Sequence, residues 1–129
     1  VAEVAEVTVR GDDVTVDKIT CAVDCGLVIN PQGAVNQVQG AIIEGLSAAL
    51  FGEITVKDGV VEQSNFDDYR FCRIAQSPQI DVHFVDSSDS PRGLGEPPLP
   101  AVAPAICNAI FAASGRRIRE LPISKSYRI

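Results

Sequence analysis

The residues best suited to chemistry lie in the segment GLGEPPLPAVAPA, at positions 93–105. It holds one carboxylate, Glu96, between two glycines and a series of prolines. Pro97 favours an extended backbone at Glu96, and the later prolines restrict the chain further. A rigidly held carboxylate suits general-base catalysis, because a base must stay within hydrogen-bonding distance of the proton that it removes. The pattern is also typical of a surface charge that complements the start of a helix, which is the commoner case for a single glutamate, and both interpretations stay open.

The hydrophobic pattern predicts the elements that position this segment. Alternating apolar and polar residues predict strands, and apolar residues at steps of three and four predict helices. This order predicts an α+β fold, a single domain over residues 1–129, in which a mostly antiparallel sheet packs against two main helices. The predicted helices cover 34–52 and 99–114, and the predicted strands cover 3–9, 14–24, 79–86 and 118–123, with a small hairpin at 53–63.

The first predicted helix carries features that an ordinary surface helix lacks. Gly40 and Gly45 lie in its interior, where each costs about 1 kcal/mol relative to alanine. They indicate either close packing inside the domain or the close approach of a ligand or another domain. Gln37 and Gln39 lie near the helix start, where their amides could be solvated or could bind a polar ligand.

Charge and cysteine content exclude several classes of function. The formal net charge of −6 argues against a nucleic-acid-binding protein, which needs clustered Lys and Arg. Cys21 and Cys25 lie four residues apart on a predicted strand, about 13 Å, which is too far for one disulfide or one zinc ion. We therefore expect buried free thiols and no metal bound by side chains.

The sequence contains no methionine and begins with Val1 in a strand-like pattern. This predicts a fragment of a larger protein, with surfaces that the missing parts would cover, and therefore self-association of the isolated chain. The alternative is a stand-alone acidic α+β interaction module without catalysis, in which Glu96 is only a surface charge.

Three blocks in order carry a family resemblance: AVDCGLVINP, VNQVQGAIIEGLSAALFGEI and GLGEPPLPAVAPAICNAIFAASGRRIRELPI. Together they resemble the C-terminal part of the molybdopterin-binding large subunit of the xanthine oxidase family of molybdenum hydroxylases, which includes aldehyde oxidoreductases. The details are most similar to the beta subunit of isoquinoline 1-oxidoreductase. The resemblance extends from about Val14 to Ile123.

The resemblance implies an enzyme that oxidises an N-heterocyclic aromatic carbon or an aldehyde carbon, using oxygen derived from water. It implies that Glu96 is the general base and that Gln37, Gly95 and Gln39 contact the cofactor. The implied cofactor is molybdopterin with molybdenum, in the cytosine dinucleotide form that is usual in bacterial members. The metal would hang on the pterin, so no side chain is implied as a metal ligand.

The resemblance also implies partners for this chain. These are the remainder of the molybdopterin-binding subunit and a subunit that carries iron–sulfur clusters. Because most cofactor contacts would lie in the remainder, the isolated chain is expected to bind no cofactor and to be inactive. The substrate stays open, and so does the compartment, since bacterial cytoplasm and periplasm are both compatible with the sequence.

Overall fold

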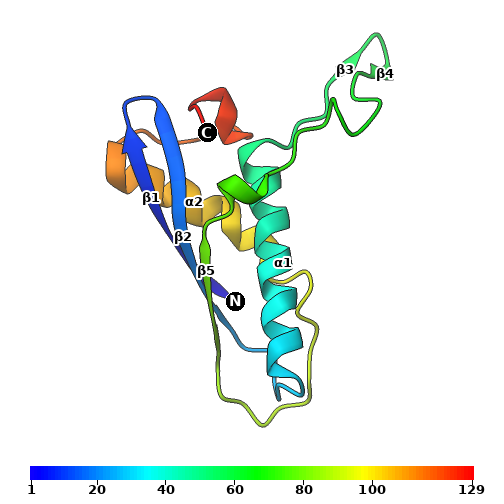
Figure 1. Cartoon of the computed structure of the whole chain (residues 1–129), viewed down its shortest axis with the longest axis vertical. Helices are drawn as coiled ribbons and strands as arrows, with labels where there is room; N and C mark the ends of the chain where they lie inside the picture. Colours follow the sequence, from blue (N-terminus) through cyan, green and yellow to red (C-terminus); the bar gives the residue numbers. More distant parts are fainter.

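The computed structural model describes residues 1–129 and contains a three-stranded sheet with two long helices (Figure 1). The predicted α+β class with two main helices is confirmed. Neither helix is both long enough and apolar enough to cross a membrane. The elements are β1 (Ala2–Arg10), β2 (Asp13–Val23), α1 (Pro31–Leu50), β3 (Val56–Lys57), β4 (Val60–Val61), β5 (Gln79–Phe84) and α2 (Leu99–Ser114), with short 3-10 helices at Ile74–Gln76 and Ile123–Lys125.

The sheet is mixed, with the strand order β1-β2-β5. Strands β1 and β2 form the predicted antiparallel hairpin, whereas β5 pairs in parallel with β2. The expectation of a mostly antiparallel sheet therefore holds for only one of the two strand pairs. The physical reason is the connection, because the chain leaves β2, passes through α1 and returns to run in the same direction.

A β-bulge in the hairpin keeps one face of β2 in the core. The register shifts where Glu6 faces Lys18 and Val7 faces Val16, so Asp17 has no partner. Before the bulge the buried residues are even-numbered, such as Val16, and after it they are odd-numbered. The extra residue on β2 shifts the alternation of side chains by one position, so the buried residues on both sides of the bulge point into the core.

One apolar core joins the inward face of the sheet to both helices. Gly45 allows the two helices to come close, because a Cβ atom there would lie 2.6 Å from the carbonyl oxygen of Leu99 on α2. Gly40 has nothing within 4 Å of such an atom, so packing inside this chain does not require it. The fully buried side chains include Ile19, Cys21 and Val23 of β2, Val38, Ile42 and Leu46 of α1, and Val102, Ile106 and Ile110 of α2.

A hairpin arm projects from the body of the molecule between α1 and β5 (Figure 1). Strands β3 and β4 form it at the predicted hairpin, and Asp58 and Gly59 both have positive φ at the turn, as in a type I′ turn. The guanidinium group of Arg70 lies 4.0 Å from the ring centroid of Phe51, which connects the arm to the end of α1.

The predicted strand at residues 118–123 is wrong, because this segment forms no strand. Pro122 and Ile123 are both buried although they are neighbours in sequence, which is incompatible with the alternating faces of a strand. Pro122 also lacks the backbone donor that a sheet would use.

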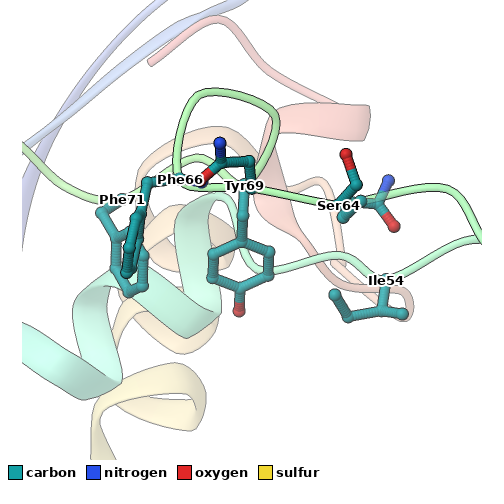
Figure 2. Close-up of a pocket in the computed structure, with 7 residues that line it drawn as sticks. Ile54, Ser64, Phe66, Tyr69 and Phe71 are labelled. Atoms are coloured by element: carbon teal, nitrogen blue, oxygen red, sulfur yellow. The ribbon is translucent and has the colours of Figure 1, made fainter.

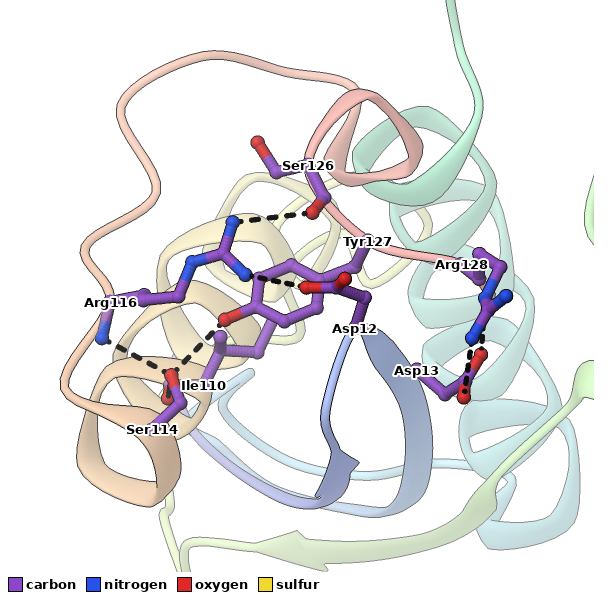
Figure 3. Close-up of polar contacts among 8 residues, drawn as sticks. All are labelled: Asp12, Asp13, Ile110, Ser114, Arg116, Ser126, Tyr127 and Arg128. Carbon is purple, nitrogen blue, oxygen red and sulfur yellow. Dashed lines mark hydrogen bonds and ion pairs between the residues drawn. The ribbon is translucent and has the colours of Figure 1, made fainter.

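Polar contacts hold the C-terminal segment against the turn between β1 and β2 (Figure 3). Arg116 donates to Asp12 over 3.0 Å, and its guanidinium group lies 4.5 Å from the ring centroid of Tyr127. Arg128 pairs with Asp13 at 2.7 Å. Helix α2 ends at Gly115, which takes the left-handed conformation with a φ of 72°.

Candidate functional site

Glu96 lies on the loop that connects β5 to α2, where its side chain is exposed. The carboxylate forms no hydrogen bond or ion pair within the chain. Its backbone oxygen accepts a hydrogen bond from the amide of Leu99, at 3.0 Å, which ties the loop to the first turn of α2. The N-cap position of α2 is Pro98, and no side chain caps the helix. The carboxylate of Glu96 is thus not used as a helix cap.

Helix α1 brings Gln37 to the same loop. A Cβ atom on Gly95 would lie 3.2 Å from Oε1 of Gln37, so the loop passes directly against this amide. Gln37 is exposed, and its side chain forms no hydrogen bond within the chain. The structure therefore places Gln37 beside the Gly95–Glu96 pair, with both polar side chains left unpaired.

Gln39 leaves α1 on a different side. Two residues along an α-helix correspond to a rotation of about 200°, so Gln39 cannot share the face of Gln37. Gly40 is about 60° from Gln37 in the same projection, and it is exposed with open space beside it. Of the four site residues expected from sequence, three lie together and Gln39 does not join them.

The start of α1 differs from the prediction. The helix begins at Pro31 rather than at residue 34, because the side chain of Asn30 accepts a hydrogen bond from the amide of Gly33 at 3.0 Å. Proline is favourable at the first helical position, where its missing donor costs nothing. This cap orients the first turns of the helix and hence Gln37.

A cavity of about 470 Å³ lies between the end of β2 and the Glu96 loop. Sequence reasoning did not select two charged residues of its wall, Asp24 and Arg92. Asp24 follows β2 directly, and a carboxylate at the end of a buried strand is a signal that could have identified it. The cavity is lined by Val23, Asp24, Arg92, Gly93, Leu94, Gly95, Glu96 and Pro97.

A second cavity, of about 450 Å³, lies on the hairpin arm (Figure 2). The rings of Tyr69 and Phe71 meet edge to face there, with centroids 4.9 Å apart. No carboxylate, imidazole or thiol lines this cavity, so it offers poor means for acid–base chemistry. Its lining residues are Ile54, Gln63, Ser64, Asn65, Phe66, Tyr69 and Phe71.

All four cysteines are free thiols, and no group of three or more His, Cys, Asp or Glu side chains is arranged to hold a metal ion. Burial, with a smaller contribution from the charge of Glu3, raises the pKa of Cys21 to about 12. Glu3 pairs with Cys21 across β1 and β2, and both of its carboxylate oxygens are buried without a hydrogen-bond partner. Burial also raises the pKa of Glu3.

Comparison with known proteins identifies similar sequences and folds. Residues 1–78 match the family model described as "Molybdopterin cofactor-binding domain". The chain is 40% identical over 125 residues to isoquinoline 1-oxidoreductase subunit beta of Brevundimonas diminuta. It is 44% identical over 110 residues to a protein of Gluconacetobacter polyoxogenes named membrane-bound aldehyde dehydrogenase [pyrroloquinoline-quinone].

A solved structure of aldehyde oxidoreductase from Desulfovibrio gigas superimposes with a TM-score of 0.73 and 29% identity, over 87% of this chain and 13% of that chain. The two sequence alignments cover 95% and 85% of this chain but only 16% and 14% of those relatives. The chain thus corresponds to about a sixth of each relative, and the longer alignment includes position 96.

Proposed function

The chain belongs to the family of molybdopterin cofactor-binding domains, and from this premise we propose that it forms part of the active site of a molybdenum hydroxylase. In this proposal the assembled enzyme oxidises an aldehyde carbon or an N-heterocyclic aromatic carbon, with oxygen derived from water. Relatives whose names include aldehyde dehydrogenase and isoquinoline 1-oxidoreductase support these two substrate classes.

The residues around the cavity fit a large polar cofactor. Gly95 offers backbone without a side chain beside Gln37, and Gly40 leaves open space on the same side of α1. The amide of Gln37 has free donors and acceptors, which suits contact with the polar groups of molybdopterin. When bound, the cofactor supplies the redox chemistry and activates the oxygen that is transferred.

Glu96 is the general base in this proposal. One of its carboxylate oxygens accepts the proton of the attacking oxygen, and the stiff loop keeps that acceptor within reach during the reaction. Gly95 and Gln37 contact the cofactor and thereby set its position relative to Glu96. The observation that carries the proposal is an unpaired carboxylate at a cavity, next to a glycine that lies against the unpaired amide of Gln37, in a member of this family.

Further parts of the assembled enzyme belong to the same proposal. We propose the cytosine dinucleotide form of the cofactor. We propose that Gln39 contributes to cofactor binding indirectly, through other parts of the protein. We also propose that iron–sulfur clusters on a partner subunit accept the electrons. The designation of one relative as a "subunit beta" supports an enzyme of several chains. The alternative of a stand-alone interaction module has no comparable support, since both sequence relatives described above are named as oxidoreductases.

The test is Glu96→Gln in the assembled enzyme, because glutamine keeps the shape of the side chain and removes the basic oxygen. We expect turnover to fall by about 10²–10⁴-fold with unchanged molybdenum content. The matched control is Glu6→Gln, which removes an exposed carboxylate from β1 and should leave turnover unchanged. A Glu96→Gln enzyme with full molybdenum and normal turnover on both substrate classes would refute the proposed role of Glu96.

A further inference from the structure

The segment after β2 crosses the loop that leads to Glu96. The amide of Leu27 donates to the carbonyl oxygen of Asp89 at 2.9 Å, and the amide of Arg92 donates to the carbonyl oxygen of Cys25 at 2.9 Å. These two hydrogen bonds run in opposite directions between the segments, so they fix both the distance and the orientation of the crossing. Gly26 is buried between them.

Gly26 is the point of closest contact in this crossing. A Cβ atom on it would lie 2.3 Å from the carbonyl oxygen of Ser90 and 2.8 Å from that of Asp89. Both neighbours are backbone atoms, which cannot rotate away as a flexible side chain would. Real Cβ atoms keep about 3.0 Å, so the backbone oxygen of Ser90, on the exposed loop, would have to move away from the buried Gly26 by about 0.7 Å.

The other end of the loop is fixed as well. The carbonyl oxygen of Leu99 lies against Gly45 of α1, and Pro98 is buried. Between the two ends, Gly95 lies against Gln37. A displacement at Ser90 therefore enters the segment that leads from the crossing to the start of α2, and Gly95 and Glu96 lie on that segment.

We propose that Gly26 is a positioning residue for Glu96. The absence of a side chain at Gly26 allows the segment after β2 to clamp the loop at Ser90, and this clamp sets the place of the Glu96 carboxylate relative to Gln37. The inference rests on the proposed function, since it assigns to Gly26 the alignment of the general base. In this proposal Gly26 acts on Glu96 through the loop.

The chain offers a closely matched control for this residue. Gly26 has a φ of 70° and Gly115, at the carboxyl end of α2, has a φ of 72°. Alanine is strained at both positions, because both have a positive φ of nearly the same size. A Cβ atom on Gly115, however, meets nothing within 4 Å. The difference between Gly26→Ala and Gly115→Ala therefore isolates the contact with Ser90 from backbone strain.

The experiment measures kcat, KM and molybdenum content of both variants in the assembled enzyme. A misplacement of a reacting group by about 1 Å can cost about 10²-fold in rate, so we expect kcat of Gly26→Ala to fall by about that factor, with little change in KM. Gly115→Ala should retain the kcat of the unmodified enzyme per molybdenum. Equal kcat values for the two variants would overturn the inference.

A double substitution separates positioning from general damage. If Gly26 acts through Glu96, then Gly26→Ala should cost little further kcat once Glu96→Gln has removed the base. An equal loss in both backgrounds would overturn the positioning role while leaving the proposed role of Glu96 intact. Normal turnover of Glu96→Gln alone would overturn both. The two proposals therefore fail in distinguishable ways.

A second variant and a second measurement keep the inference testable if Gly26→Ala does not fold. Asparagine adopts the left-handed region more readily than alanine, so Gly26→Asn keeps the contact with Ser90 at lower backbone strain, with Gly115→Asn as its control. Hydrogen exchange of the Arg92 amide reports the crossing directly. We expect faster exchange at Arg92 in Gly26→Asn than in Gly115→Asn, and equal rates would contradict the clamp.

Discussion

The contact between the two helices at Gly45 allows a sharp test of the packing. In Gly45→Ala, the new methyl group would lie 2.6 Å from the carbonyl oxygen of Leu99 and 2.9 Å from Cγ2 of Val102. Both distances are too short for a real contact, so α1 and α2 must move apart. In Gly40→Ala on the same helix, the new methyl group meets nothing within 4 Å.

The two substitutions share one energy term and differ in the other. Each replaces a helical glycine by alanine, which stabilises the helix by about 1 kcal/mol. Overpacking of a well-packed contact costs about 1–3 kcal/mol, and only Gly45→Ala incurs that cost. We therefore expect Gly40→Ala to be more stable than the unmodified chain and Gly45→Ala to be about 1–3 kcal/mol less stable than Gly40→Ala.

Urea or thermal unfolding of the two variants measures this difference. In a domain of this size about 1 kcal/mol corresponds to about 4 °C in Tm, so the two midpoints should lie about 4–12 °C apart. Unchanged m-values would show that the variants unfold from comparable states. Equal stability of Gly40→Ala and Gly45→Ala would refute the close contact between the helices.

Two further predictions concern the groups inside the sheet. The pKa of Glu3 is raised by burial, so as pH increases the unfolded chain loses this proton first and the fold loses stability. Glu3→Gln should therefore raise Tm at about pH 7 and change it little at about pH 3, where the carboxyl is protonated in both states; a larger gain at acid pH would contradict this. Mass spectrometry after brief alkylation at about pH 8 should find label on the half-buried Cys72 and Cys107 before the buried Cys21 and Cys25, since the reagent must reach the sulfur atom. Early labelling of Cys21 would contradict its burial.

Local patterns predicted most of the secondary structure. The hairpin, both helices and the loop around Glu96 follow from periodicity, turn residues and prolines that act over a few neighbours. The sequence predicts a start at residue 34 because a proline disfavours helix at the residue before it, although Asn30 and Pro31 form the cap and the first helical position of α1. The strand expected at 118–123 failed because the burial of Ile123 depends on contacts with distant residues.

The sequence predicts residues of the candidate site only where a single segment contains the signal for them. Glu96 and Gln37 were selected from their own surroundings and from the family resemblance, yet their meeting at Gly95 depends on how α1 lies against the loop. Gly26 was not selected, because its role arises from Ser90, which is far away in sequence. A contact between two backbone segments leaves no periodic signal in either.

The parallel pairing of β2 with β5 has a consequence for the order of folding. Lys18 pairs with Gln79, so this ladder closes a loop of about 60 residues, at an entropic cost of about 4 kcal/mol. In the β1–β2 hairpin, Arg10 pairs with Asp13, which is close in sequence, so this pairing closes only a tight turn. Local contacts form faster than distant ones, so the hairpin and α1 should precede β5. The Glu96 loop begins where β5 ends, and it can take its place only after this slow closure.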